Sequence, residues 1–188
     1  VPVHLGGGWA GVQRRRNISS ETTGTSPRSR GATLIRRSSR ANSHGQSNVI
    51  TVLYLYPMTG RPDRDLPENW DDIPGARGCT PQSCAFRDHF AKLRDYGVDQ
   101  LLGISTQDTA YQTEAAERLH LPFPLLSDAD GALRAALELP TMTVEGDVLL
   151  KRLTMIARDG VIEQVFYPVF PPDQDADNVI DSLRSHAE

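Results

Sequence analysis

The run Val49-Ile-Thr-Val-Leu-Tyr-Leu-Tyr56, which Pro57 ends, decides the fold class of this chain. Its side chains are mostly β-branched, aromatic or aliphatic, which is typical of a strand buried on both faces. Such strands lie inside parallel or mixed sheets whose faces are covered by helices. The run is also far shorter than the roughly 20 apolar residues that a membrane-spanning helix needs. We therefore expect a buried central strand and no membrane segment.

Strands and helices alternate after this run. Phe86, Phe90 and Leu93 recur at three- and four-residue spacing, which predicts a helix that Gly97 ends. A tight turn at residues 158–160 between two apolar runs predicts a hairpin. The expected helices cover residues 79–96, 108–119, 128–137 and 175–186, and the expected strands cover residues 49–56, 98–105, 123–126, 151–157 and 161–167. This order predicts the α/β class with a central mixed sheet.

The front of the chain differs in composition from the rest. Residues 1–47 contain eight arginines and a single acidic residue, so they carry a net charge of +7 and leave −11 on residues 48–188. They are rich in Gly, Ser and Thr without a sustained apolar period, so we expect a poorly ordered basic arm with residues 32–35 as a candidate edge strand. A nucleic-acid tether and a transit peptide are weaker alternatives, because the arm has few aromatic residues and no clear amphipathic helix. The remaining residues, 48–188, are expected to form one domain.

Residues 57–78 lie between the first strand and the first helix and are rich in residues that break regular structure. Their prolines and glycines are Pro57, Pro62, Pro67, Pro74, Gly60, Gly75 and Gly78. Loops of this length inside a compact domain are uncommon and are usually functional or disordered. We therefore expect a long loop directly before the helix.

The two cysteines of the chain, Cys79 and Cys84, lie close together at the start of that helix. A secreted domain held by disulfides uses more cysteines at wider spacing, so this pair indicates reactive chemistry in a reducing compartment such as the cytoplasm. The unpaired N–H groups and the positive dipole end of a helix favour a thiolate in its first turn. Pro81 agrees with a first turn. We therefore expect Cys79 to be a nucleophile with a lowered pKa.

The spacing of the cysteines places a constraint on any bond between them. Five residues along an intact helix separate the two Cα atoms by roughly 8.6 Å, whereas a disulfide needs less than about 7 Å. A Cys79–Cys84 disulfide therefore requires the helix to unwind. Two inert core thiols and a metal site are the alternatives, although His89 and His120 form no recognisable ligand pair with them.

Four segments of the chain form a specific combination: Val52-Leu-Tyr-Leu-Tyr-Pro57, Gly78-Cys-Thr-Pro-Gln-Ser-Cys-Ala-Phe-Arg-Asp88, Leu102-Gly-Ile-Ser-Thr106 and Pro124-Leu-Leu-Ser-Asp128. In their order and approximate spacing, these segments resemble the bacterioferritin-comigratory or Q-type peroxiredoxins. The resemblance extends from about residue 49 to the end of the chain. It implies a thioredoxin-like fold and the reduction of hydrogen peroxide or organic hydroperoxides. It also implies that this reaction uses no metal, haem or flavin cofactor.

The resemblance also assigns roles to single residues. Cys79 matches the peroxidatic cysteine, which becomes a sulfenic acid, and Cys84 matches the resolving cysteine, which closes an intramolecular disulfide. A thioredoxin-like or glutaredoxin-like partner would reduce that disulfide. Arg152 matches the arginine that stabilises the thiolate and polarises the peroxide, tasks that suit a fixed guanidinium.

The sequence departs from the family pattern just before Cys79. The family places a proline seven residues before the nucleophile and a threonine or serine three residues before it, where this chain has Asp72 and Ala76. Pro57 and Thr59 lie on the far side of an apparent insertion. Thr59 is therefore a candidate for the missing hydroxyl, with an ordinary turn residue as the alternative. The loop around Trp70 could form a lid or shape the substrate site.

These observations favour a cytoplasmic thiol peroxidase that is a monomer or a weak dimer and binds neither membranes nor nucleic acid. A thiol–disulfide exchange protein without peroxidase turnover is one alternative, because the hydroxyl position before Cys79 is altered. A redox sensor whose cysteine pair switches structure is the other. Peroxide consumption with a thiol donor separates the first reading from both alternatives.

Overall fold

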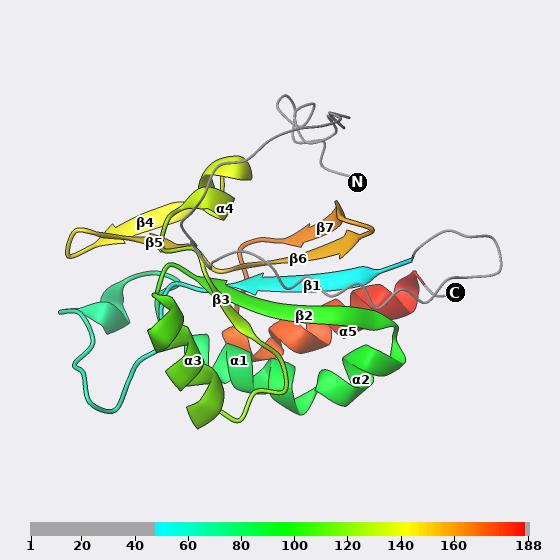
Figure 1. The fold of residues 1–188 in the computed structure, drawn as a ribbon, viewed down its shortest axis with the longest axis horizontal. Helices are drawn as coiled ribbons and strands as arrows, with labels where there is room; N and C mark the ends of the chain where they lie inside the picture. Colours follow the sequence, from blue (N-terminus) through cyan, green and yellow to red (C-terminus); the bar gives the residue numbers. More distant parts are fainter. Residues whose placement is uncertain (1–47, 187–188) are drawn as a thin grey trace, which may run out of the picture. The chain divides into compact units, whose positions relative to one another are not determined.

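The computed structural model describes residues 48–186, and the expectations for the arm at residues 1–47 lie outside them. A five-stranded sheet with the order β3-β2-β1-β6-β7 forms the centre of this region (Figure 1). Its strands are β1 (Ile50–Leu55), β2 (Val98–Ser105), β3 (Leu125–Ser127), β6 (Leu153–Arg158) and β7 (Val161–Phe166). β1 pairs in parallel with β2 and antiparallel with β6. The predicted mixed sheet with a buried central strand is therefore confirmed.

Helices cover both faces of this sheet. They are α1 (Cys79–Asp88), α2 (Phe90–Asp95), α3 (Thr109–Arg118), α4 (Ala132–Ala136) and α5 (Asp175–Ser185), with short 3-10 helices η2 (Trp70–Asp72) and η3 (Pro172–Gln174). α1, α2 and α5 lie against one face, where Phe86, Leu93 and Ile180 join Val52 of β1 in the larger core (Figure 1). α4 lies on the other side, where its Leu133 packs against a smaller core.

The first predicted helix, residues 79–96, is two helices in the structure. α1 and α2 meet at His89, whose backbone leaves the helical region at φ −97° and ψ 5°. The Nδ1 atom of His89 lies 2.9 Å from the Ala85 carbonyl, and its Nε2 lies 3.2 Å from Asp177 of α5. Side-chain bonds of this kind compete with the helical ladder. The helix that carries both cysteines is therefore short and ends at its own boundary.

A hairpin between α4 and β6 was missing from the sequence expectations. β4 (Thr141–Val144) and β5 (Asp147–Leu150) form a separate two-stranded sheet. Glu145 and Gly146 both have positive φ, 50° and 93°, as a two-residue hairpin turn requires. Leu149 of β5 packs against Trp70 from the long loop. The hairpin therefore supports the loop that precedes Cys79.

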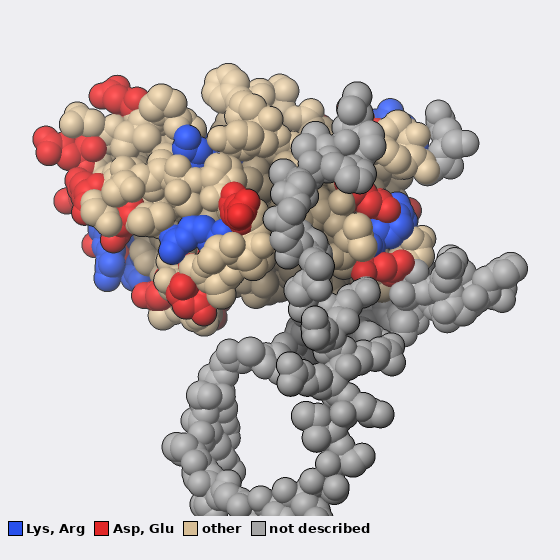
Figure 2. Space-filling model, turned by 90° about the horizontal axis from the view of Figure 1, so that it is seen from above, with Lys and Arg blue, Asp and Glu red and all other residues tan. Residues whose placement is uncertain are grey.

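Charged side chains of both signs lie in small groups on the face drawn in Figure 2, and several of the acidic ones lie along one edge of it. Among the described residues, no helix is both long and apolar enough to cross a membrane.

Candidate active site

Cys79 is the first residue of α1, as predicted. Gly78 precedes it as the N-cap residue and has a left-handed backbone conformation. Gly78 has φ +94°, and a Cβ atom there would lie 2.6 Å from Cγ of Pro172 in η3. Both the backbone conformation and the packing therefore require glycine. The close contact places the start of α1 directly against the segment that leads into α5.

The Cys79 side chain is buried among hydrogen-bonding groups. Only 3% of the residue is exposed, and its Sγ donates to the Ala76 carbonyl over 3.4 Å. Nη2 of Arg152 donates to the same sulfur over 3.3 Å. The thiol therefore lies between a carbonyl that accepts a hydrogen bond from it and a guanidinium that favours its ionisation. The structure thus brings together two of the predicted site residues, Cys79 and Arg152.

The pKa of the Cys79 thiol does not follow the sequence expectation. Burial raises this pKa above its ordinary value, while the Arg152 guanidinium and a hydrogen bond from the Met58 backbone lower it. The prediction of a lowered pKa was wrong because it considered the helix end and left burial out. Arg152 is the main group that opposes the burial of the thiolate.

Arg152 is held by hydrogen bonds to the long loop and to α1. It lies in the short link between β5 and β6, one residue before the observed start of β6, and is 4% exposed. Its Nη2 donates to the Arg77 carbonyl over 2.7 Å, and its Nη1 donates to Oε1 of Gln82. These contacts fix the guanidinium in a plane that faces Cys79.

Sequence reasoning missed Gln82, although its position offered a signal. Gln82 lies three residues after Cys79 and therefore on the same side of α1. Its side chain is fully buried and joins Arg152 to Asp175 of α5, which also accepts from Thr154. No sequence pattern pointed to Asp175, because only the fold brings α5 to this place.

Cys84 lies on the same helix as Cys79, five residues later. It is half-buried, and both thiols are free. Arg87, one turn further along α1, is the charged group beside the Cys84 sulfur. Because α1 is continuous from Cys79 to Asp88, it holds the two cysteines five residues apart on one helix.

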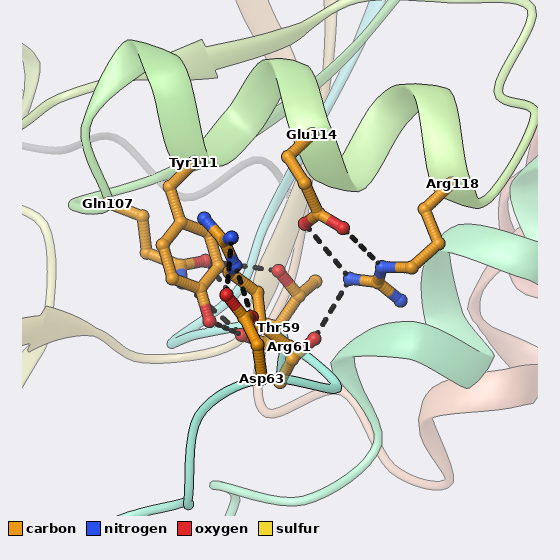
Figure 3. A network of polar contacts seen from close by, with 8 residues as sticks. Thr59, Arg61, Asp63, Gln107, Tyr111, Glu114 and Arg118 are labelled. Atoms are coloured by element: carbon orange, nitrogen blue, oxygen red, sulfur yellow. Dashed lines mark hydrogen bonds and ion pairs between the residues drawn. The ribbon is translucent and has the colours of Figure 1, made fainter.

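Thr59 has a different partner from the one that the family pattern suggests. Its hydroxyl donates to Oε1 of Gln107 over 3.2 Å, and its carbonyl accepts from the Tyr111 hydroxyl over 2.8 Å (Figure 3). Arg118 donates to the neighbouring Gly60 carbonyl over 2.9 Å. No hydrogen bond joins Thr59 to Cys79 among the described contacts. The network attaches the beginning of the long loop to α3 instead.

The long loop also forms one wall of an open pocket beside Cys79. The pocket has a volume of about 330 Å³ and is lined by Met58, Leu66, Trp70, Ala76, Thr80 and Pro81 together with Cys79. Trp70 is 5% exposed and packs against Val144 and Leu149 of the hairpin. The predicted influence of the Trp70 loop on the site thus has a structural basis: the loop is a packed wall of the pocket.

The donor set of the described region offers no metal centre. No three His, Cys, Asp or Glu side chains of residues 48–186 gather in an arrangement that would hold a metal ion. Cys79 itself presents a sulfur beside the Arg152 guanidinium.

Comparison with known proteins identifies the family of this chain. The redoxin family model matches residues 47–180. The chain belongs to the redoxin family. It is 29% identical over 134 residues to chloroplastic peroxiredoxin Q of Populus jackii, covering 71% of this chain and 55% of that protein. Peroxiredoxin Q of Arabidopsis thaliana matches with the same identity, covering 71% of this chain and 54% of that protein. The chain thus spans about half the length of these curated relatives.

Solved structures resemble this redoxin as well. Peroxidoxin BcpB from Mycobacterium tuberculosis is 28% identical with a TM-score of 0.57, covering 74% of this chain and 80% of that chain. A variant of PrxQ from Xylella fastidiosa has a TM-score of 0.59 at 22% identity, covering 75% of this chain and 79% of that chain, a likeness that concerns the fold. The thioredoxin-like fold and the resemblance to Q-type peroxiredoxins are therefore confirmed.

Proposed function

We propose that this chain is a thiol peroxidase that reduces hydrogen peroxide or organic hydroperoxides with Cys79. The Arg152 guanidinium, 3.3 Å from Sγ of Cys79, is the observation that carries the proposal. The Cys79 thiolate attacks one peroxide oxygen, so that an S–O bond forms while the O–O bond breaks. The second oxygen leaves with a proton as water or an alcohol. Cys79 is oxidised to a sulfenic acid, and the cation stabilises the charge on the sulfur and the departing oxygen.

Cys84 completes the proposed cycle. Its thiolate attacks the Cys79 sulfur, an S–S bond forms, and the sulfenic oxygen leaves as water. Since both residues belong to α1, the helix must unwind over this segment before the sulfurs meet. The break at His89 confines the unwinding to α1 and leaves α2 in place. A thioredoxin-like or glutaredoxin-like dithiol then reduces the disulfide and is itself oxidised.

A second candidate function rests on the altered position before Cys79. Ala76 is fully buried and places a methyl group where the family pattern has a hydroxyl. A site that lacks this donor binds a peroxide less firmly, whereas thiol–disulfide exchange needs no such donor and requires only that the buried Cys79 sulfur becomes accessible. Exchange without peroxide turnover is therefore the alternative that the test below separates.

The predictions on compartment and assembly are less direct than those on chemistry. The plant relatives are named as chloroplastic, so the expected cytoplasmic location stays a prediction. The expected monomer or weak dimer also stays a prediction, as do the absence of a cofactor and of nucleic-acid binding. These expectations concern the whole protein. The curated relatives are about twice as long as the segment that matches this chain.

The test is a stopped-flow reaction of the reduced chain with hydrogen peroxide and with an organic hydroperoxide. The chain is compared with Cys79→Ser and Cys84→Ser, and the products are identified by mass spectrometry. We expect fast consumption that is lost only in Cys79→Ser, and a sulfenic acid that persists only in Cys84→Ser. A chain that reacts no faster than a free thiol, but still exchanges with a disulfide substrate, would favour the exchange function.

A further inference from the structure

Asp175 is a buried carboxylate that the proposed reaction does not use directly. It lies at the first position of α5 and has no exposed surface. Its Oδ2 accepts a hydrogen bond from Nε2 of Gln82 over 2.7 Å and another from Oγ1 of Thr154 over 2.7 Å. The carboxylate therefore joins α1, β6 and α5 at a point directly behind the Cys79 site.

The hydrogen bond from Gln82 to Asp175 decides which way the Gln82 amide points. An amide has a donating end and an accepting end, whereas an ionised carboxylate only accepts and a guanidinium only donates. With its NH2 group bound to Asp175, Gln82 turns its oxygen toward Nη1 of Arg152. The reverse orientation would place donor against donor at Arg152. The carboxylate thus determines whether Gln82 attracts or repels the guanidinium.

The same network contains the unsatisfied groups of the described region. Among buried side-chain nitrogen and oxygen atoms of residues 48–186, Nε of Arg152 and Oδ1 of Asp175 lack a hydrogen-bond partner. Buried polar atoms without partners are unfavourable and are rare in native structures. Both atoms belong to the two charged residues that flank Gln82.

Other charges around Cys79 do not account for the position of the guanidinium. Tyr54 and Tyr56 lie near the thiol, and burial raises the pKa of both phenols, so they remain neutral near neutral pH. Burial also raises the pKa of Asp175, while the hydrogen bonds from Thr154 and Gln82 and the charge of Arg152 lower it. The hydrogen bonds therefore help to keep Asp175 in the acceptor form that orients Gln82.

We propose that Asp175 is a positioning residue for the Cys79 reaction, which acts through Gln82 to hold the Arg152 guanidinium against the sulfur. The inference rests on the proposed function in that Cys79 is taken as the nucleophile. Asp175 exchanges no proton or electron with the substrate. Its contribution is the orientation of one amide, which places the cation where the thiolate forms.

The experiment uses the full chain in a Cys84→Ser background, so that Cys79 is its one thiol. The variants are Asp175→Leu, Asp175→Asn, Gln82→Met and the double variant Asp175→Leu/Gln82→Met. Asp177→Asn is the matched control, because Asp177 lies on the same helix but pairs with His89 at the surface. The readouts are the pH midpoint of Cys79 alkylation by iodoacetamide and the second-order rate with hydrogen peroxide.

We expect Asp175→Leu to raise the alkylation midpoint by about one pH unit and to lower the peroxide rate about tenfold at neutral pH, because the thiolate fraction falls by that factor. Asp175→Asn should recover most of the rate, since its Oδ1 can accept from the same two donors. Asp175→Leu should add nothing to Gln82→Met, because the path through Gln82 is already removed. Asp177→Asn should match the parent.

Three outcomes would overturn the proposal: no shift in Asp175→Leu, an equal loss in Asp175→Asn, or effects of Asp175→Leu and Gln82→Met that add. Equal loss in the asparagine variant would assign the effect to charge rather than to amide orientation. Circular dichroism confirms folding, and Asp175→Ala replaces Asp175→Leu in the same comparison if the leucine variant does not fold. If the parent chain reacts with peroxide no faster than a free thiol, the proposed function fails. The pH midpoints of Cys79 alkylation then still test the role of Asp175.

Discussion

Two pieces of backbone meet at Cys79, and they are fixed in different ways. Helix α1 is fixed by a buried chain of polar contacts in which Gln82 bonds both Arg152 and Asp175. The long loop before α1 is attached to α3 at its beginning by the polar network around Thr59. In its middle, the apolar contacts of Trp70 attach it to the β4–β5 hairpin. Figure 1 shows this loop on the side of the domain where β4 and β5 lie.

The difference indicates that the two regions affect different properties of the site around the Cys79 sulfur. Directional hydrogen bonds specify the position of a charge, so the α1 side sets the electrostatics of the Cys79 thiolate. Apolar packing specifies shape without direction, so the Trp70 part of the loop fixes the shape of the pocket wall beside Cys79. The end of the loop belongs to both regions, because the Arg77 carbonyl accepts from Arg152.

The largest effect that tests this comparison is expected in the loop. Trp70→Ala should lower the free energy of unfolding by about 4 kcal/mol, because it removes a buried aromatic side chain and leaves a cavity. The alkylation pH midpoint of Cys79 should stay close to that of the parent. Urea unfolding and iodoacetamide titration measure the two quantities, with Trp70→Phe as the milder control. A shifted midpoint would show that packing and electrostatics are coupled.

The next largest effect is expected on the electrostatic side. Arg152→Lys should slow the reaction of Cys79 with peroxide about a hundredfold, which corresponds to about 2.7 kcal/mol, because an ammonium cannot make the planar set of bonds to Gln82, Arg77 and the sulfur. Burial already raises the pKa of the Cys79 thiol, and a less well-placed cation raises it further, so the thiolate fraction at neutral pH falls. The pH midpoint of alkylation should therefore move upward.

Stopped-flow traces and the alkylation profile measure this loss, and the exposed Lys151→Ala is the matched control one residue away. A variant that keeps the rate of the parent would exclude Arg152 from the chemistry. It would leave the helix end and the backbone donors as the stabilising groups of the thiolate.

The sequence was sufficient for those parts that rest on local patterns. The buried run at residues 49–56 predicted β1, the apolar spacing predicted α1 and α2 as one helix, and the Asp159-Gly160 turn predicted the β6–β7 hairpin. The first-turn position of Cys79 was also predicted. Each of these features depends on neighbours within a few residues, which a single sequence displays directly.

Most of the parts that the sequence did not predict depend on distant contacts, and one, the β4–β5 hairpin, is local. The break at His89 involves Asp177 of α5, and the β4–β5 hairpin was overlooked although its Glu145-Gly146 turn was visible in the sequence. The partners of Arg152 come from α1, the loop and, through Gln82, from α5. The raised pKa of the Cys79 thiol follows from burial, which only the packed fold determines.

Two glycines, one in each region, allow the effect of an added Cβ atom to be compared. Gly78 at the start of α1 and Gly75 in the loop both have positive φ, +94° and +82°. A Cβ at Gly78 meets Pro172, whereas a Cβ at Gly75 meets nothing within 4 Å. Gly78→Ala should therefore lower the free energy of unfolding by about 2 kcal/mol or more, against about 1 kcal/mol for the backbone strain alone in Gly75→Ala.

Urea unfolding of both alanine variants measures this difference, and the rate with peroxide adds a second comparison. We expect only Gly78→Ala to slow Cys79, because the start of α1 must shift away from Pro172 and takes the sulfur with it. Equal losses of stability would mean that η3 yields easily, and that the close packing of α1 on it does not position the nucleophile.

The smallest effect is expected at Thr59. Its two candidate roles, attachment of the loop and donation to the Cys79 sulfur, predict different peroxide rates. Thr59→Val keeps the volume of the side chain and removes the hydroxyl that donates to Gln107, while the Thr59 backbone N–H still donates to the same oxygen over 3.0 Å. We expect a loss of about 1 kcal/mol in stability, as for one hydrogen bond, and a peroxide rate within about threefold of the parent. If Thr59 turned toward the sulfur and served as the missing hydroxyl, the rate would instead fall about a hundredfold, as for a donor lost from a reacting site. Thr59→Ser, which keeps the hydroxyl, is the control that separates this loss from a change in packing.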